Sequence, residues 1–172
     1  FAKIRRITGG AFSWVDARTL LPDRYRDEVV EDGVKKVSDA RLRRQPDAVT
    51  IETQFGDERD ATTFARAGEV LDAVAGAYYV RAARLEAGDE LCFDLVANRR
   101  YWRFRGKVAA GTDRVETPAG TFDTVRVEAT VSRADAPASR RPLHLWISTG
   151  PHHEMVAAAS EIDLGPISLT LS

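Results

Sequence analysis

The sequence TDRVETPAGTFDTVRVEATVSR, residues 112–133, decides the fold class. Its centre, TPAG at residues 117–120, predicts a tight turn, because proline pre-sets its own φ and glycine adopts conformations closed to other residues. After the turn, polar residues alternate with the apolar residues Val125, Val127, Ala129 and Val131. A period of two is typical of a strand with one buried and one solvated face, so we expect a β-hairpin here.

The same alternation recurs along most of the chain. The tripeptide EDG at residues 31–33 separates strand patterns at 25–31 and 34–43 and predicts a second hairpin. Further strand patterns occupy residues 12–16, 49–55, 61–66, 91–95, 102–108, 143–147, 155–162 and 167–171. Many short strands joined by hairpins predict a mainly β protein built as an antiparallel meander.

Residues 69–84 have helical spacing instead, with apolar residues at positions that fall on one helix face. We expect one amphipathic helix here, with Leu71, Val74 and Tyr78 buried against the sheet. The simplest arrangement is a meander curled into a half-open barrel around this helix. Its concave apolar surface would be covered only in part.

Length and composition limit the possible classes of protein. With 172 residues the chain is expected to be one domain, spanning residues 1–172, and its apolar fraction of 44% is normal for a globular protein. The 25 basic and 26 acidic residues give a net charge of −1, so a nucleic-acid partner is not expected. No apolar stretch is long enough for a transmembrane segment. Cys92 is the one cysteine, which excludes an intrachain disulfide.

Four segments resemble a known family. They are WVDARTLLP at 14–22, YYVR at 78–81, VETPAGTFD at 115–123 and LWIS at 145–148. In this order and spacing they resemble the bacterial domain-of-unknown-function family 3108. The resemblance implies an exported protein of Gram-negative bacteria, periplasmic or associated with the outer membrane. It also implies that this chain lacks N-terminal strands that family members normally carry. The family has no established activity, and its likeness to the lipoprotein-carrier half-barrels is an analogy of fold alone.

Aromatic residues supply the candidate ligand site. Tyr78, Tyr79, Trp102 and Phe104 either line a cavity for an apolar ligand or form part of the core, and the sequence favours neither reading. If a cavity exists, we expect Arg81 and Arg103 to meet a charged headgroup at its mouth.

Other reactive residues have plainer explanations. Adjacent His152 and His153 would point to opposite faces of a strand, which is poor geometry for a metal, so a solvated turn is favoured. Cys92 is expected to be at least half-buried in its strand. The carboxylates around Gly56 are expected to be solvated, namely Glu52, Asp57, Glu58 and Asp60.

A run of basic residues marks one strand: Arg99, Arg100, Arg103, Arg105 and Lys107. It either meets an anionic headgroup or partner or is a solvated strand face, and the second reading is favoured. The chain contains no phosphate-binding glycine loop, nucleophile elbow or metalloprotease helix motif. We therefore expect no catalytic residue, no metal and no cofactor.

Two functions fit these patterns. The leading hypothesis is a non-enzymatic envelope protein that binds an apolar ligand, such as an acyl chain or lipid, or another envelope component. The alternative is a structural module of a larger surface assembly, completed by a strand from a partner protein. An enzyme is a distant third possibility.

Overall fold

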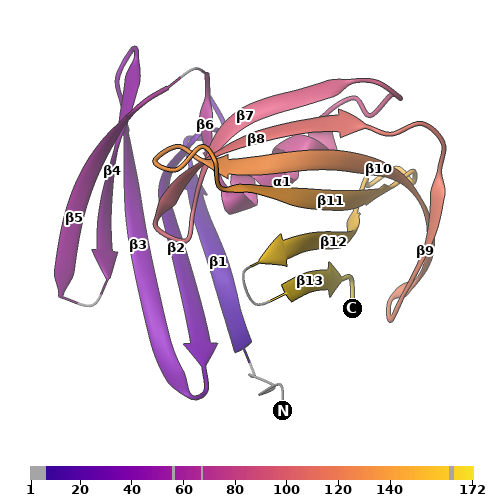
Figure 1. The fold of residues 1–172 in the computed structure, drawn as a ribbon, viewed down its shortest axis with the longest axis horizontal. Helices are drawn as coiled ribbons and strands as arrows, with labels where there is room; N and C mark the ends of the chain where they lie inside the picture. Colours follow the sequence, from indigo (N-terminus) through magenta and orange to yellow (C-terminus); the bar gives the residue numbers. More distant parts are fainter. Residues whose placement is uncertain (1–6, 56, 67, 163–164) are drawn as a thin grey trace. The chain divides into compact units, whose positions relative to one another are not determined.

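The structure is a computed structural model that describes residues 7–55, 57–66, 68–162 and 165–172. Within these residues it contains thirteen strands and one helix, which confirms the mainly β prediction (Figure 1). The strands form two sheets, one of five and one of eight strands.

The five-stranded sheet has its strands in sequence order and is antiparallel throughout. It contains β1 (Ile7–Val15), β2 (Pro22–Glu31), β3 (Val34–Arg44), β4 (Ala48–Phe55) and β5 (Glu58–Ala65). The EDG hairpin joins β2 to β3 as predicted, with Glu31 paired to Val34.

The eight-stranded sheet has the order β13-β12-β11-β10-β8-β7-β6, and β9 pairs with β10. Its strands are β6 (Val70–Asp72), β7 (Glu90–Ala97), β8 (Arg100–Val108), β9 (Asp113–Thr117), β10 (Gly120–Arg133), β11 (Arg140–Ser148), β12 (Met155–Ile162) and β13 (Gly165–Thr170). The predicted hairpin at residues 112–133 is confirmed as β9 and β10, with Gly120 paired to Thr117 at φ +135°.

The predicted half-open barrel is wrong, because the strands divide between two sheets and neither is closed or strongly curled. The reason lies at β6, which pairs in parallel with β7 and not with β5. Parallel neighbours need a crossover connection, and α1 (Ala73–Ala82) is that crossover. The helix therefore links two strands of one sheet, whereas the meander prediction placed it as a plug inside a barrel.

The predicted helix is confirmed in type, but it begins and ends inside the predicted range of 69–84. Leu71 is buried, at 6% exposure, as a residue of β6. Tyr78 is 62% exposed, so its predicted burial is wrong. The buried stripe of α1 contains Gly76 and Val80. Each lies two residues from Tyr78, or roughly 200° around the helix, which turns Tyr78 to the opposite side.

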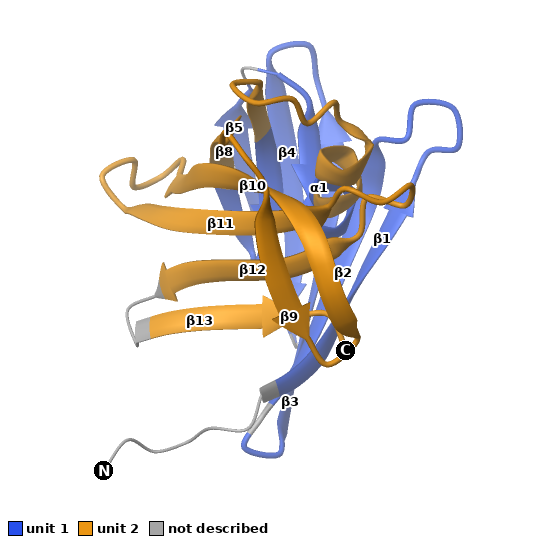
Figure 2. Ribbon diagram, turned by 90° about the vertical axis from the view of Figure 1, so that its right-hand side faces the viewer, with its two compact units in different colours: residues 1–76, 94–101 blue, residues 77–93, 102–172 orange. Residues whose placement is uncertain are grey.

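The contacts within the chain define two compact units (Figure 2). Unit 1 comprises residues 1–76 and 94–101, and unit 2 comprises residues 77–93 and 102–172. The core of unit 1 includes one face of the five-stranded sheet, with the buried side chains Tyr25, Ala40, Leu42, Val49 and Ile51. The core of unit 2 includes Phe104, Val108, Val127, Leu145, Ile147 and Val156. The expectation of one domain stays a prediction.

Candidate functional site

Three aromatic rings form a column in unit 2, running from α1 to β7 and β8. Tyr79 meets Phe93 edge-on at 5.3 Å between ring centroids, and Phe93 stacks on Phe104 at 4.5 Å. Phe104 is 2% exposed, whereas Tyr79 is 46% exposed. We call Tyr79, Phe93 and Phe104 the aromatic column. It leads from the core of unit 2 to its surface.

The exposed end of the column opens on a groove of about 380 Å³, which we call the helix-end groove. It is lined by Tyr79, Ala82, Ala83, Arg84, Asp89, Glu90 and Leu91. Two alanines and Leu91 are its apolar lining residues, and Arg84, Asp89 and Glu90 are its charged ones. Arg84 pairs with Glu86 and lies 3.9 Å from Asp89, and its hydrogen bond lowers the pKa of Glu86.

Arg81 lies on another side of the helix and is engaged with the protein itself. Its guanidinium donates to the backbone oxygens of His153 and His152 at 2.9 and 3.0 Å. The ring Nδ1 of His153 lies 3.0 Å from the Arg81 carbonyl, and the Arg81 guanidinium lies 5.2 Å from the centre of the Tyr78 ring. This arrangement fixes the end of α1 to the turn between β11 and β12. The predicted headgroup role of Arg81 is not tested by it.

The five predicted ligand-binding residues thus fall into separate places. Tyr79 and Phe104 belong to one aromatic column, whereas Tyr78 and Arg81 lie together elsewhere on α1. Trp102 is half-buried on β8, where it pairs with Arg133 of β10. Sequence reasoning missed Phe93, which joins Tyr79 to Phe104. The turn at residues 98–99 was a usable signal, because it folds β7 back on β8 and brings Phe93 near Phe104.

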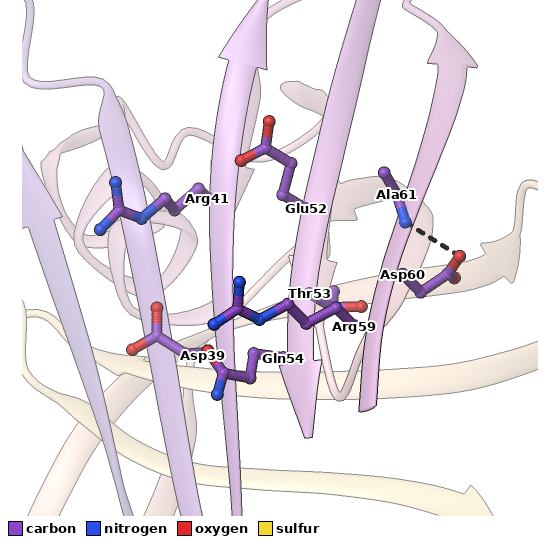
Figure 3. Close-up of a pocket in the computed structure, with 8 residues that line it drawn as sticks. All are labelled: Asp39, Arg41, Glu52, Thr53, Gln54, Arg59, Asp60 and Ala61. Atoms are coloured by element: carbon purple, nitrogen blue, oxygen red, sulfur yellow. Dashed lines mark hydrogen bonds between the residues drawn. The ribbon is translucent and has the colours of Figure 1, made fainter. Parts of the chain in front are cut away.

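A pocket of about 580 Å³ lies on the solvated face of β3, β4 and β5 in unit 1 (Figure 3). Two of its carboxylates, Asp39 and Glu52, form ion pairs. Asp39 accepts a hydrogen bond of 2.9 Å from Arg24, and Glu52 accepts one from Arg43, which lowers the pKa of Glu52. Asp60 accepts the backbone N–H of Ala61 at 2.9 Å. A carboxyl that is more acidic than usual is unsuited to general-acid catalysis.

Two buried carboxylates of unit 1 accept hydrogen bonds from within the protein. Asp72 accepts hydrogen bonds from the Ser13 hydroxyl and the backbone N–H of Ala75, and burial raises its pKa. Asp94 accepts a hydrogen bond of 2.7 Å from the hydroxyl of Tyr101, whose ring stacks on Phe64 at 4.7 Å. Both carboxylates have protein partners, as buried polar groups require.

The remaining reactive residues are dispersed. In the described part of the chain, no group of three or more His, Cys, Asp or Glu side chains is placed to hold a metal. Cys92 is exposed, so its expected burial is wrong. Leu91 and Phe93 take the inner positions of β7, and the alternation of the strand turns Cys92 outward.

No helix among the described residues has the length and apolar character needed to cross a bilayer.

The fold and the groove define a mainly β protein with two sheets and a surface groove that Tyr79 helps to line. The whole chain, residues 1–172, matches DUF3108, a family of proteins of unknown function, and it belongs to this family. The predicted family resemblance is therefore confirmed. No curated protein and no solved structure matches the chain. Family membership brings no activity, ligand or partner with it.

Proposed function

We propose that this chain is a non-enzymatic protein of the bacterial envelope that binds an apolar ligand, such as an acyl chain, in the helix-end groove. One observation carries the proposal. Tyr79, at the solvent end of the aromatic column, is 46% exposed and lines a groove together with Ala82, Ala83 and Leu91. The volume of about 380 Å³ lies within the range of small-molecule sites.

The groove has the chemistry of an amphiphile site. Ala82, Ala83 and Leu91 offer apolar contact, and Arg84 offers a cation. Exposed ion pairs such as those of Arg84 with Glu86 and Asp89 contribute little to stability. Arg84 is therefore free to exchange these partners for the carboxylate or phosphate of a ligand.

The envelope location in this proposal rests on the family resemblance in the sequence. The non-enzymatic role is supported by the carboxylates, since Asp39, Glu52, Asp72 and Asp94 each have a partner within the protein.

A titration with a fluorescent fatty acid tests the proposal. The intact chain is expected to bind, and Tyr79→Ala is expected to weaken binding roughly three- to tenfold, because the ligand would cover the exposed half of a side chain whose full burial contributes about 1.5–3 kcal/mol. Tyr78→Ala is the matched control, since it removes a neighbouring exposed tyrosine that lies outside the groove. Absence of binding, or equal losses in both variants, would reject the groove as the site.

A second function, the assembly module, is favoured by strand β1. This strand is one edge of the five-stranded sheet, and its nine residues carry no charge. Phe12 is 50% and Trp14 is 43% exposed. The opposite edge, β5, begins with Glu58, Arg59 and Asp60, the kind of charges that protect an edge from pairing. An uncharged edge with exposed aromatic residues suits the addition of a strand from a partner.

A photo-crosslinking residue placed at Phe12 tests this alternative in the native envelope. A discrete crosslinked protein from position 12, and none from the control position Thr62 on β5, is the expected result. No product at position 12, or the same products at both positions, would count against an assembly module.

A further inference from the structure

Strand β8 carries exposed cations at alternate positions in unit 2. Arg103, Arg105 and Lys107 are all exposed, whereas Phe104, Gly106 and Val108 between them are buried. In the described part of the chain, none of the three cations makes an ion pair or a side-chain hydrogen bond. Other arginines of the chain do so, including Arg24, Arg43, Arg84, Arg126 and Arg133.

The strand register adds a fourth cation to the same face. Arg103 pairs with Ser132 of β10, and Ser132 pairs with Arg140 of β11, which is also exposed. Two strand spacings separate Arg103 from Arg140, or about 10 Å, and two residues along β8 separate Arg103 from Arg105, or about 7 Å. The side chain beside Arg105 on β10 is the neutral Thr130.

Lys107 has carboxylates nearby, so it adds less net positive charge to this face of the sheet. It lies directly opposite Glu128 of β10, and the neighbouring strand β7 begins with the exposed Glu90 at the same end, where Val108 bonds to Asp89. The positive charge is thus concentrated at Arg103, Arg105 and Arg140, which we call the arginine cluster.

Solvation of this strand face does not by itself require such a concentration of charge. A solvated strand face needs polar side chains, and the serine and threonine of β10 satisfy that need without charge. Like charges placed 7–10 Å apart repel one another, by Coulomb's law with the distances of strand geometry. An anionic partner removes this repulsion.

We propose that the arginine cluster docks unit 2 on an anionic lipid surface through the phosphates of the headgroups. This inference rests on the envelope location in the proposed function, but it does not depend on the helix-end groove. The sheet is not strongly curled, so its arginines can meet a planar partner together. Guanidinium groups bind phosphate oxygens through paired hydrogen bonds. The net charge of −1 gives the whole chain no general attraction to nucleic acid.

Vesicle co-sedimentation tests the proposal with phosphatidylglycerol-containing vesicles and with pure phosphatidylcholine vesicles. The chain is expected to bind the anionic vesicles at low salt, to be released at high salt and to ignore the neutral vesicles. The triple variant Arg103→Gln, Arg105→Gln and Arg140→Gln is expected to lose roughly 100-fold in affinity, or about fivefold for each arginine near the surface. The three corresponding lysine substitutions should keep most of the binding.

Two controls separate local from overall charge. The variant Arg18→Gln, Arg41→Gln and Arg59→Gln removes three exposed cations of unit 1 that are not part of the arginine cluster, and it is expected to change affinity less than about threefold, because only cations at the lipid surface contribute strongly to binding. Lys107→Gln should have a smaller effect than Arg105→Gln. Thermal unfolding of each variant verifies that it is folded.

Failure to bind anionic vesicles, or equal losses in both triple variants, would overturn the proposal. Binding to polyglutamate but not to vesicles would also overturn it and would indicate an acidic protein partner. Binding of the chain to inorganic phosphate with the vesicle affinity would show that no lipid surface is recognised. The fatty-acid titration, repeated on the arginine-cluster variant, should be unchanged, so failure here is distinguishable from failure of the groove.

Discussion

The hydroxyl of Ser13 donates a hydrogen bond of 2.6 Å to Oδ2 of Asp72. The other oxygen of the same carboxylate accepts the backbone N–H of Ala75 at 2.8 Å, so Asp72 caps the first turn of α1. Asp72 is fully buried. One side chain therefore joins the edge strand β1 to the start of the helix within unit 1.

Replacing this carboxylate should destabilise the fold. Asp72→Ala removes a helix cap and leaves the Ser13 hydroxyl without its partner, and we expect a loss of roughly 2–4 kcal/mol in the free energy of unfolding. Asp60→Ala, at an exposed position on β5, should change it by less than about 0.5 kcal/mol. Urea denaturation measures both, and a loss from Asp72→Ala as small as that of the control would contradict the capping role.

Asp72 should also affect how the free energy of unfolding depends on pH. Burial raises the pKa of Asp72 above its ordinary value of 3.8, so the folded chain holds this proton more tightly than the unfolded chain does. The contribution of Asp72 to the free energy of unfolding should therefore fall as the pH rises from about 4 through the folded-state pKa. Asp27, whose pKa burial also raises, adds a slope of the same sign. Asp72→Asn should remove only the contribution of Asp72 to this pH dependence. An unchanged slope of the free energy of unfolding against pH in this variant would contradict the account.

Leu71 and Tyr78 should respond in opposite ways to truncation. Leu71 is 6% exposed in β6, and Leu71→Ala is expected to cost roughly 2–5 kcal/mol of stability. Tyr78 is 62% exposed, and Tyr78→Ala should cost less than about 0.5 kcal/mol. Equal losses by chemical denaturation would show that the helix presents a different face to the core.

Gly9 and Gly10 are adjacent in β1 but have different surroundings, so their alanine variants can be compared directly. A Cβ on Gly9 would lie 2.4 Å from the carbonyl oxygen of Glu28 on β2, whereas a Cβ on Gly10 would lie 3.5 Å from the Phe12 ring. Gly9→Ala should therefore destabilise the pairing of β1 with β2 by about 1–3 kcal/mol, the range for overpacked sites. Gly10→Ala should be close to neutral. The reverse order of stabilities would place β1 in another register.

The sequence predicts those parts of the fold whose signals are local. The hairpin of β9 and β10 follows from Pro118 and Gly120 in the turn and from the alternation after it. Its pairing needs no information from distant residues. The family follows in the same way from short segments, and the comparison confirms it.

The parts that the sequence does not predict depend on distant contacts. No local pattern shows that β6 leaves the meander to pair in parallel with β7, so the half-open barrel was wrong. The predicted helix included Leu71, which lies in strand β6. The predicted apolar face was therefore assigned to Leu71, Val74 and Tyr78, although Tyr78 is exposed. The groove combines the end of α1 with the start of β7, and of the five predicted ligand-binding residues it includes Tyr79 alone.

The most direct test of the central claim is an NMR titration of the chain with a spin-labelled fatty acid. If the helix-end groove holds the acyl chain, the amide signals of residues 79, 82–84 and 89–91 should broaden first. The signals of Ser168 and Leu169 on β13, which lies five strands from β7 in the same sheet, should remain sharp. Uniform or absent broadening, or broadening confined to residues outside the groove, would contradict the claim that this chain binds an apolar ligand there.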